Sequence, residues 1–238
     1  MSVNFQSLYV LASGGERAFE QLNTISNNIA NVNTPGFKKI LLKEMSQKIP
    51  DNPGQSKELF IFPRFEDTPV VLSQGSIRKT DNPLDLAING DGFFKVKVGN
   101  KSILTRNGHF HIDKDGYLVD TNYNYILDKQ DKKIKLDPTK DITILENGDI
   151  YQEGNLVASL NILNFYSVKP IGSSYYTPNG NPKDANFKVL QGFLENSNVN
   201  PIKSMVELIN AQRRMEMYGT MMRSLDSLQQ KSNEIGKA

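Results

Sequence analysis

The stretch that decides the fold reads Ala30-Asn31-Val32-Asn33-Thr34-Pro35-Gly36-Phe37-Lys38, and it directly follows an amphipathic helix pattern. A second motif reads Leu194-Glu195-Asn196-Ser197-Asn198-Val199, and it directly precedes another such pattern. Because Pro35 pushes Thr34 out of the α region and Gly36 accepts a positive φ, the first helix is expected to end at this turn. Two helical ends around a middle of another kind are typical of a subunit that assembles through its termini.

The N-terminal pattern has apolar or small residues at alternating spacings of three and four. These positions are Phe5, Leu8, Ala12, Gly15, Phe19, Leu22, Ser26 and Ile29. Such spacing is the a/d seam of a heptad repeat, and it predicts a helix that packs against another helix. The small residues at Gly15 and Ser26 would let a neighbouring backbone approach closely. An ordinary amphipathic helix on the core of its own domain explains the pattern equally well.

The C-terminal pattern predicts a second, longer helix. Asn200 is suited to cap it and Pro201 to begin its first turn. The heptad seam consists of Leu208, Ala211, Met215, Tyr218, Met222, Leu225, Gln229 and Ser232. Further apolar residues widen it at Met205, Ile209, Met221, Leu228 and Ile235. The apolar face is thus broader than a two-helix seam, as expected for a helix with several neighbours.

Between about Val70 and Leu190 the pattern changes to short apolar runs separated by turn pairs. Turn pairs occur at Asn89-Gly90, Gly99-Asn100, Asn107-Gly108, Asp115-Gly116, Asn147-Gly148 and Gly154-Asn155. A turn every ~8–12 residues is typical of antiparallel β domains. Residues 170–185 are rich in glycine, proline and asparagine, and they predict a long surface loop.

These patterns together predict an α+β fold in three parts. Residues 1–66 would form the N-terminal helix and an extended connector, residues 67–190 a central all-β domain, and residues 191–238 the C-terminal helix. The two terminal helices are expected to pair in a coiled-coil-like manner. Each is marginal alone because helix nucleation is costly, so the ends are expected to need each other or other copies of the chain.

The composition excludes several classes of protein. The chain has no cysteine, which excludes disulfides, thiolate metal sites and a cysteine nucleophile. With 28 basic and 26 acidic residues, its charge gives no reason to expect nucleic acid or an anionic membrane as a partner. No stretch approaches the ~18 apolar residues of a membrane span, so no membrane insertion is expected. The N-terminus lacks a basic region followed by an apolar one, so no cleavable signal peptide is expected.

The sequence offers only weak candidates for catalysis or metal binding. His109 and His111 would share one face of a strand, where Asp113 or Asp115 could complete a metal site. Two surface positions beside a turn explain them better. No G-x-x-x-x-G-K-[ST] phosphate loop and no G-x-S-x-G serine motif occur. We therefore expect no enzyme activity and no cofactor.

Several blocks of the sequence carry a family resemblance. They are residues 27–38, 75–77, 80–94, 104–110, 115–119, 191–199, 205–209 and 212–213. In this order they resemble the flagellar rod and hook family of bacterial axial proteins, and they span most of the chain. Distal rod and hook relatives usually carry an alanine-tyrosine-glutamate stretch after the Gln-Arg pair, whereas Gln212-Arg213 is followed here by Arg214-Met215-Glu216-Met217-Tyr218. The resemblance is closest to a proximal rod protein, with a distal rod or hook-type axial subunit as the alternative.

The resemblance implies a structural subunit of the flagellar basal-body rod in the periplasmic space. Such proteins leave the cell unfolded through the flagellar type III export apparatus, without a cleaved signal. Copies stack helically with one another and with other rod proteins above and below. Their terminal helices form an inner tube that lines the export channel and transmits torque, and the β domain lies outside.

Two groups of residues are assigned roles on this basis. The expected subunit-interface residues are Phe5, Leu8, Phe19, Leu22, Ile29, Leu208, Met215, Met222 and Leu225. The expected turn residues, which fix how the chain leaves the inner helix and re-enters it, are Asn31, Thr34, Pro35, Gly36, Phe37, Glu195, Ser197 and Asn198.

Two rival functions remain open from the sequence. One is a secreted β-domain module that binds glycans through exposed aromatic residues, for which Tyr123, Tyr125, Tyr175 and Tyr176 are candidates. The other is a cell-wall hydrolase, for which the sequence contains no recognisable set of acid, base or metal ligands.

Overall fold

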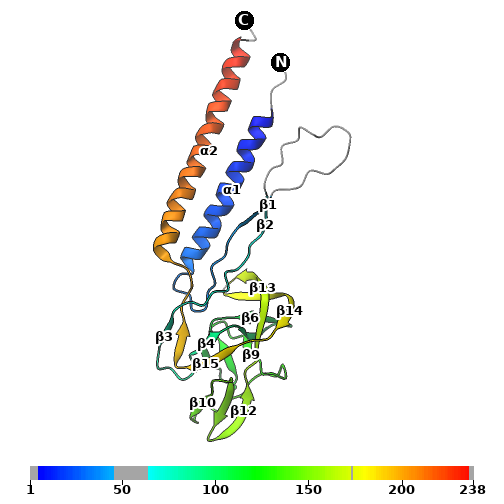
Figure 1. Cartoon of the computed structure of the whole chain (residues 1–238), viewed down its shortest axis with the longest axis vertical. Helices are drawn as coiled ribbons and strands as arrows, with labels where there is room; N and C mark the ends of the chain where they lie inside the picture. The colour runs from blue at the N-terminus through cyan, green and yellow to red at the C-terminus, as the bar shows by residue number, and fades with distance from the viewer. Residues whose placement is uncertain (1–4, 46–63, 173, 236–238) are drawn as a thin grey trace. The chain divides into compact units, whose positions relative to one another are not determined.

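The computed structural model describes residues 5–45, 64–172 and 174–235, which are coloured in Figure 1. The chain divides into two compact units. The helical unit comprises Met1–Ile29, Leu42–Thr68 and Asn200–Ala238, and the β unit comprises Ala30–Leu41 and Pro69–Val199. A mostly β middle with one helix towards each end of the chain confirms the predicted α+β class.

The secondary structure begins and ends with the two helices. In chain order the elements are α1 (Phe5–Ala30), β1 (Lys43–Met45), β2 (Arg64–Asp67), β3 (Ile77–Lys79), β4 (Leu86–Gly90), β5 (Phe93–Val98), β6 (Lys101–Thr105), β7 (Phe110–Ile112), β8 (Leu118–Asp120), β9 (Tyr125–Ile126), β10 (Ile142–Ile144), β11 (Asp149–Gln152), β12 (Asn155–Ser159), β13 (Ile162–Gly172), β14 (Tyr175–Lys183), β15 (Phe187–Gln191), β16 (Phe193–Glu195) and α2 (Pro201–Ile235).

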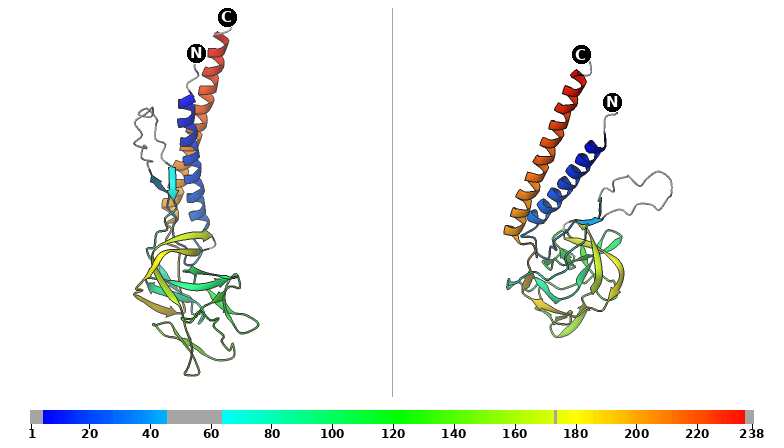
Figure 2. Two further views of the ribbon diagram at one scale, coloured as in Figure 1. Left: turned by 90° about the vertical axis from the view of Figure 1, so that its right-hand side faces the viewer. Right: turned by 45° about the horizontal axis from the view of Figure 1, so that its top comes forward.

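In the helical unit, α1 and α2 run antiparallel and lie side by side in the views of Figures 1 and 2. Asn200 caps α2 as predicted, because its Oδ1 accepts a hydrogen bond from the backbone N of Lys203 at 3.0 Å. The phenol ring of Tyr218 lies against Gly14, where an added Cβ would come within 2.6 Å of the ring. A small residue in α1 therefore admits a large ring from α2. Among the described residues, no helix is long and apolar enough to cross a bilayer.

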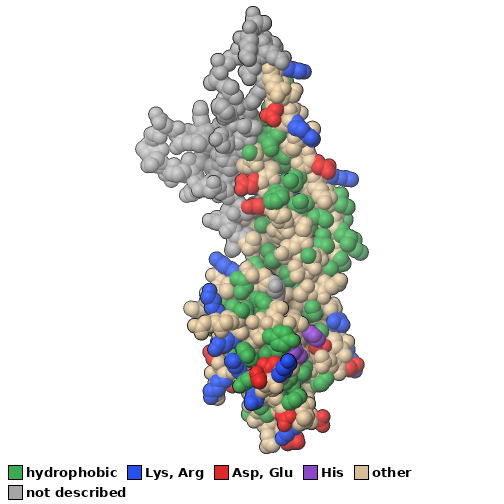
Figure 3. Space-filling model, turned by 180° about the vertical axis from the view of Figure 1, so that it is seen from behind, with side chains coloured by type: hydrophobic (Ala, Val, Ile, Leu, Met, Phe, Trp, Pro, Cys, Tyr) green, Lys and Arg blue, Asp and Glu red, His purple; other side chains and the backbone are tan. Residues whose placement is uncertain are grey.

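α2 exposes many large apolar side chains, and Figure 3 shows hydrophobic side chains along it. The exposed set is Ile202, Met205, Val206, Ile209, Met215, Met217, Met221 and Leu228. At 100° per residue, most of these lie on the side of the helix opposite the buried Ala211. α2 is thus apolar on more than one side, which is typical of a helix that neighbours surround.

The β unit contains a seven-stranded sheet in the order β13-β14-β6-β5-β9-β8-β7, whose pairs are antiparallel. A three-stranded sheet β10-β11-β12 and the two-stranded pairs β15-β4 and β16-β3 complete it. The last two pairs matter for the site, because they join the end of the β unit to strands from its beginning. Leu194, for example, is in register with Arg78.

The predicted long loop at 170–185 is wrong. β14 occupies most of this stretch and pairs antiparallel with β13, with Val168 opposite Pro178 and Phe165 opposite Pro182. β13 pairs with one edge of β14, whereas β6 pairs with the other edge only at Tyr175 and Tyr176. Within the described structure, that second edge has no partner strand around Pro178 and Pro182, and proline is tolerated at such an edge. The composition of this stretch indicated a loop, but its pairing with β13 makes it a strand.

Two apolar clusters form the core of the β unit, and β5 separates them. Phe94 and Val96 face the larger cluster, whereas Phe93 faces a smaller one that includes Phe165 and Tyr176. Successive residues of a strand point to opposite faces, so both faces of β5 are buried. Phe94 also packs edge-to-face on Phe110, with ring centroids 5.1 Å apart.

Phe94→Ala should destabilise the β unit strongly. The ring is fully buried, so its removal leaves a cavity and should lower the free energy of unfolding by about 3–5 kcal/mol. Urea titration of the purified chain, followed by circular dichroism, measures the change. Tyr166→Ala is the control, because Tyr166 is 80% exposed and its loss should change stability by about 0.5 kcal/mol or less. Similar losses in the two variants would contradict the assignment of the core.

Candidate functional site where the two terminal motifs meet

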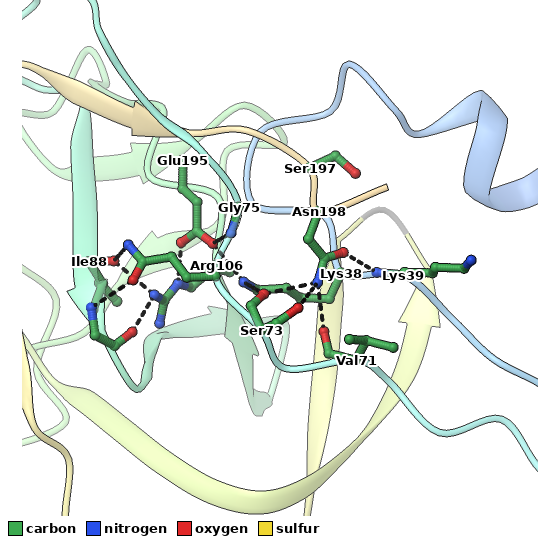
Figure 4. A network of polar contacts seen from close by, with 12 residues as sticks. Lys38, Lys39, Val71, Ser73, Gly75, Ile88, Arg106, Glu195, Ser197 and Asn198 are labelled. Atoms are coloured by element: carbon green, nitrogen blue, oxygen red, sulfur yellow. Dashed lines mark hydrogen bonds and ion pairs between the residues drawn. The ribbon is translucent and has the colours of Figure 1, made fainter. Parts of the chain in front are cut away.

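The two motifs quoted at the outset lie together in the β unit, although 157 positions separate Lys38 from Glu195. The backbone N of Gly36 donates to the carbonyl oxygen of Glu195 at 2.7 Å. The backbone N of Asn198 donates to the carbonyl oxygen of Phe37 at 3.3 Å. Figure 4 shows the polar contacts around this meeting point, which we call the motif junction.

The first motif enters the junction through a tight turn. The backbone N of Thr34 donates to the carbonyl oxygen of Asn31 at 3.1 Å, and that of Phe37 donates to the carbonyl oxygen of Thr34 at 3.2 Å. Gly36 has a φ of 68°, as the sequence predicted. A Cβ on Gly36 would lie 2.2 Å from the carbonyl carbon of Arg106, so the turn also requires the smallest residue for space. Phe37 follows the turn and is buried.

Glu195 is the centre of the junction. Its Oε1 accepts hydrogen bonds from Lys38 Nζ at 2.6 Å and from the backbone N of Gly75 at 2.8 Å. Its Oε2 accepts from Arg106 Nε at 2.6 Å. The side chains of Glu195, Lys38 and Arg106 are only 1%, 2% and 4% exposed, respectively. One carboxylate therefore compensates two cations out of contact with water.

Backbone carbonyl groups compensate the remaining positive charge. Arg106 Nη2 donates to the carbonyl oxygens of Ile88 at 2.8 Å and Gly90 at 2.6 Å. Arg106 Nη1 donates to the carbonyl oxygen of Gly92. Lys38 Nζ donates to the carbonyl oxygen of Ser73 at 2.8 Å. Buried cations are tolerated where their donors are satisfied in this way.

Burial governs the protonation of two groups at the junction. Removal from water lowers the pKa of the Lys38 ammonium; the Glu195 carboxylate opposes this shift and Arg106 adds to it. Burial also raises the pKa of the Tyr176 phenol, whose oxygen accepts a hydrogen bond from the backbone N of Lys38 at 2.9 Å. Tyr176 therefore stays neutral at physiological pH and serves as an acceptor for the chain that leaves the turn.

Asn198 binds the two motifs to a third segment. Its Oδ1 accepts from the backbone N of Lys39 at 2.6 Å, while its Nδ2 donates to the carbonyl oxygens of Val71 and Ser73, both at 2.9 Å. Ser197 Oγ accepts a local bond from the backbone N of Val199 at 3.2 Å. The residues before α2 are thus fixed by side-chain contacts as well as by strand pairing.

The structure brings the predicted turn residues together but scatters the predicted interface residues along the helices. Leu22, Ile29, Leu208, Met222 and Leu225 are partly buried, whereas Phe19 and Met215 are exposed. The side chains of Phe5 and Leu8 lie outside the described part of the structure. The buried residues of α1 are instead Gly14, Ala18, Ile25 and Asn28, about one position away around the helix.

Sequence reasoning missed Arg106 and the roles of Lys38 and Tyr176. Lys38 was quoted in the first motif and Arg106 in the matched blocks, but no periodicity marks a charge as buried. Tyr176, a candidate glycan contact, is 1% exposed and cannot serve as one. Its position two residues into β14 was hidden by the expectation of a loop.

The geometry favours a structural role over catalysis at the junction. The contacts described here occupy Glu195, Lys38 and Arg106 with one another and with the backbone. His109 bonds Asp85, with Nδ1 to Oδ1 at 2.7 Å, while His111 packs on Tyr123. The two histidines therefore contact different partners, and in the described segments no three His, Cys, Asp or Glu side chains are grouped to hold a metal.

Glu195→Gln should destabilise the β unit because it leaves Lys38 and Arg106 buried without an anion. We expect a loss of about 3–5 kcal/mol in the free energy of unfolding, measured by urea titration. Glu146→Gln is the control, because Glu146 pairs at 2.7 Å with Lys188 on the surface and should lose less than about 1 kcal/mol. Lys38→Met leaves Arg106 paired with Glu195, so it should lower the free energy of unfolding less than Glu195→Gln does. A larger loss for Lys38→Met would refute the charge argument.

Gly36→Ala should cost more than Gly154→Ala, although both residues have left-handed backbones, with φ of 68° and 80°. The conformational cost alone is about 1–2 kcal/mol for either. A Cβ at Gly154 meets nothing within 4 Å, whereas one at Gly36 must displace the backbone of Arg106. Calorimetry should therefore give a clearly larger drop in melting temperature for Gly36→Ala. Equal drops would mean that the turn is not held against Arg106.

Comparisons with known proteins agree with the positions of the motifs. Residues 8–38 match the family described as "Flagella basal body rod protein", residues 87–152 match "Flagellar hook protein FlgE/F/G D1 domain", and residues 190–235 match "Flagellar basal body rod FlgEFG protein C-terminal". The motif junction thus joins the end of the first match to the beginning of the last.

Whole-length relatives carry the same description. The chain is 31% identical to the flagellar basal-body rod protein FlgF of Mesorhizobium japonicum, with 93% of each chain covered. It is 32% identical to FlgF of Caulobacter vibrioides, with 97% of this chain and 98% of that one covered. It is 30% identical to FlgG of Bacillus subtilis, with 94% and 97% covered. The chain therefore belongs to the flagellar basal-body rod protein family and is a structural subunit of the bacterial flagellar rod.

Proposed function

We propose that this subunit polymerises helically through its terminal helices, which pair in a coiled-coil-like manner and line the export channel. The main support is the exposed apolar surface of α2, where residues such as Ile202, Met205 and Ile209 are exposed in the described part of the chain. A buried apolar side chain contributes about 1.5–3 kcal/mol, so neighbours that cover this surface would be bound strongly. Repeated contacts between different surfaces make a tube rather than a closed ring.

The contacts between α1 and α2 support a helix pair that is complete only in the assembly. Tyr218 fits against Gly14, and Arg214 donates to Gln21 Oε1 at 2.7 Å. Phe19 and Met215 of the predicted seam stay exposed, which leaves them available to other copies. On this proposal the ends order as they dock, which restricts growth to the tip of the rod.

The motif junction supports the division of the subunit into an assembling and an outer part. It fixes residues 34–38 and 195–198 at one place in the β unit, so both connections to the helices start from a rigid base. We assign the helical unit to the inner tube and the β unit, which includes residues 30–41 and 191–199, to the outer domain. Torque would then pass through the packed helices.

We further propose a proximal position in the rod, with other rod proteins above and below. The support is the sequence after Gln212-Arg213, which lacks the alanine-tyrosine-glutamate stretch of distal and hook relatives. A place in the periplasmic space, reached through the flagellar type III export apparatus without a cleaved signal, follows from this proposal. No enzyme activity is needed for any of these roles.

Leu22→Asp or Met222→Asp should abolish rod assembly and swimming while leaving the β unit folded. Both side chains are partly buried members of the predicted seam, and a charge there would oppose helix packing. Motility in soft agar and electron microscopy of isolated basal bodies give the readout. Limited proteolysis of the purified variants should yield the same β-unit fragment as the parent chain.

The matched controls place the same new charge on exposed polar positions of the same helices. Asn23→Asp and Asn210→Asp add the same charge without removing an apolar side chain, so they should impair swimming less than Leu22→Asp and Met222→Asp. Normal swimming by Leu22→Asp and Met222→Asp would disprove assembly through this seam.

A further inference from the structure

One exposed face of the β unit combines tyrosine rings with lysine ammonium groups. Its members come from β7, β8, β9 and the segments beside them: His111, Tyr117, Tyr123, Tyr125, Lys133 and Lys135. We call it the tyrosine–lysine face. Figure 3 shows histidine side chains beside hydrophobic and Lys or Arg side chains on this unit.

Strand alternation places these side chains on one side of the sheet. His111 and Tyr125 are both in register with Val119, and residues opposite each other in an antiparallel pair point to the same face. In the segment that follows, Lys133 and Lys135 are exposed while Ile134 and Leu136 between and after them are buried. The apolar residues thus enter the core, and the rings and cations form an outer layer.

The outer layer is held together by ring and cation contacts. Tyr117 and Tyr125 pack edge-to-face with centroids 5.6 Å apart. The Nζ atom of Lys133 lies 3.5 Å from the ring centroid of Tyr125, and that of Lys135 lies 5.6 Å from the centroid of Tyr117. These contacts stiffen long lysine side chains, so less entropy is lost when their ammonium groups bind an anion.

Tyr123 is exposed on a loop that is unusually well fixed. Its side chain is 70% exposed and its φ is 60°, a strained value for a residue with a side chain. Asp120 holds the loop. Its Oδ1 accepts hydrogen bonds from the backbone N of Asn122 at 2.8 Å and from the backbone N of Asn124 at 2.9 Å. Its carbonyl oxygen accepts one from the backbone N of Tyr123. The ring also packs edge-to-face on His111, with centroids 5.1 Å apart.

The partly buried phenol of Tyr175 supports the same loop. Tyr175 donates to Asp120 Oδ2 at 2.5 Å and accepts from Asn122 Nδ2 and Asn124 Nδ2, both at 2.9 Å. Burial, with the hydrogen bond to Asp120, raises the pKa of Tyr175 to about 12. Fixing an aromatic side chain in solvent does nothing for the stability of the core, and strain of this kind points to a use at the surface.

The charges of the face are not balanced within the described structure. There, neither Lys133 nor Lys135 lies within ion-pair distance of a carboxylate, whereas nearby Lys95 pairs with Asp131 at 2.6 Å. Asp113 and Asp120 beside the face accept hydrogen bonds from the backbone of their own turns, and neither pairs directly with Lys133 or Lys135. The face is therefore complementary to a partner with negative charge.

We propose that the tyrosine–lysine face binds a carboxylate-bearing glycan. The C–H groups on one side of a pyranose ring pack on an aromatic face, which the exposed ring of Tyr123 offers, while Lys133 and Lys135 bind carboxylates. An acidic peptide is a poorer fit, because it would use the ammonium groups of Lys133 and Lys135 without using the exposed ring of Tyr123. The choice of source rests on the proposed function: a cell-envelope subunit meets the muramyl glycan of peptidoglycan, which bears free carboxylates where its peptides have been removed.

Binding of peptide-free muramyl glycan strands to the purified full chain tests the proposal, with calorimetry or pull-down as the readout. Tyr123→Ala should weaken binding about tenfold or more, and Tyr123→Phe should retain it, because stacking needs the ring and not the hydroxyl. Lys133→Ala with Lys135→Ala should weaken binding similarly and reduce its dependence on salt. Chitohexaose, which has the same kind of backbone without carboxylates, should bind at least about tenfold more weakly than the muramyl strands.

Tyr166→Ala is the matched control, since Tyr166 is an equally exposed tyrosine of the β unit with the ammonium of Lys183 4.9 Å from its ring centroid. It should leave glycan binding unchanged. Absence of glycan binding, equal losses for Tyr166→Ala and Tyr123→Ala, or equal binding of polyglutamate that depends on Tyr123 would each overturn the proposal. Because these experiments use the unassembled chain, their failure is distinguishable from failure of rod assembly, which motility measures.

Discussion

The carboxylate of Glu195 lies between two buried cations, and the way in which both ends of the β unit are held depends on that placement. A buried charge pair contributes little net stability compared with apolar residues, but it is costly to break. Such a group therefore acts mainly as a constraint. Any arrangement that separated the first motif from the second would leave Lys38 or Arg106 buried without its anion, and this cost selects the observed junction.

The constraint acts together with the backbone. Gly36 can approach Arg106 because it lacks a Cβ. The side chain of Asn198 bonds Lys39 and Val71, whose segments also pair through the antiparallel bridge between Ile40 and Val70. Three stretches far apart in the sequence thereby become one rigid piece. On the proposed function, such a base would let both connections to the helices bear load while the helices contact several neighbours.

The helices follow a different physical rule from the β unit. The β unit buries its apolar residues in its own core, as β5 does with Phe93 and Phe94 on opposite faces. α2 instead leaves Met205, Ile209 and Leu228 exposed, so its apolar surface exceeds what one chain covers. On the proposed function, the β unit is folded before assembly, and α2 obtains the remaining burial from neighbouring subunits.

Local rules made several parts of this protein predictable. The turn at Thr34-Pro35-Gly36, the cap at Asn200 and the turn between β5 and β6 depend on residues next to one another, and the structure has all three. The stretch around Pro178 was misread because composition indicates a loop while the pairing that makes β14 comes from β13. Local sequence carries no information about a partner strand.

The sequence by itself determined the α+β class, the helical ends with their surplus of apolar residues, and the two motifs that identify the family. Only the tertiary structure decided that Lys38, Arg106 and Glu195 share one buried site, and that Tyr176 is buried while Tyr123 is exposed to solvent. The physical reason is that helix periodicity and turns arise from neighbours in the chain. The buried contacts of Lys38 and Arg106 with Glu195 join residues 157 and 89 positions apart, whose approach no local pattern encodes.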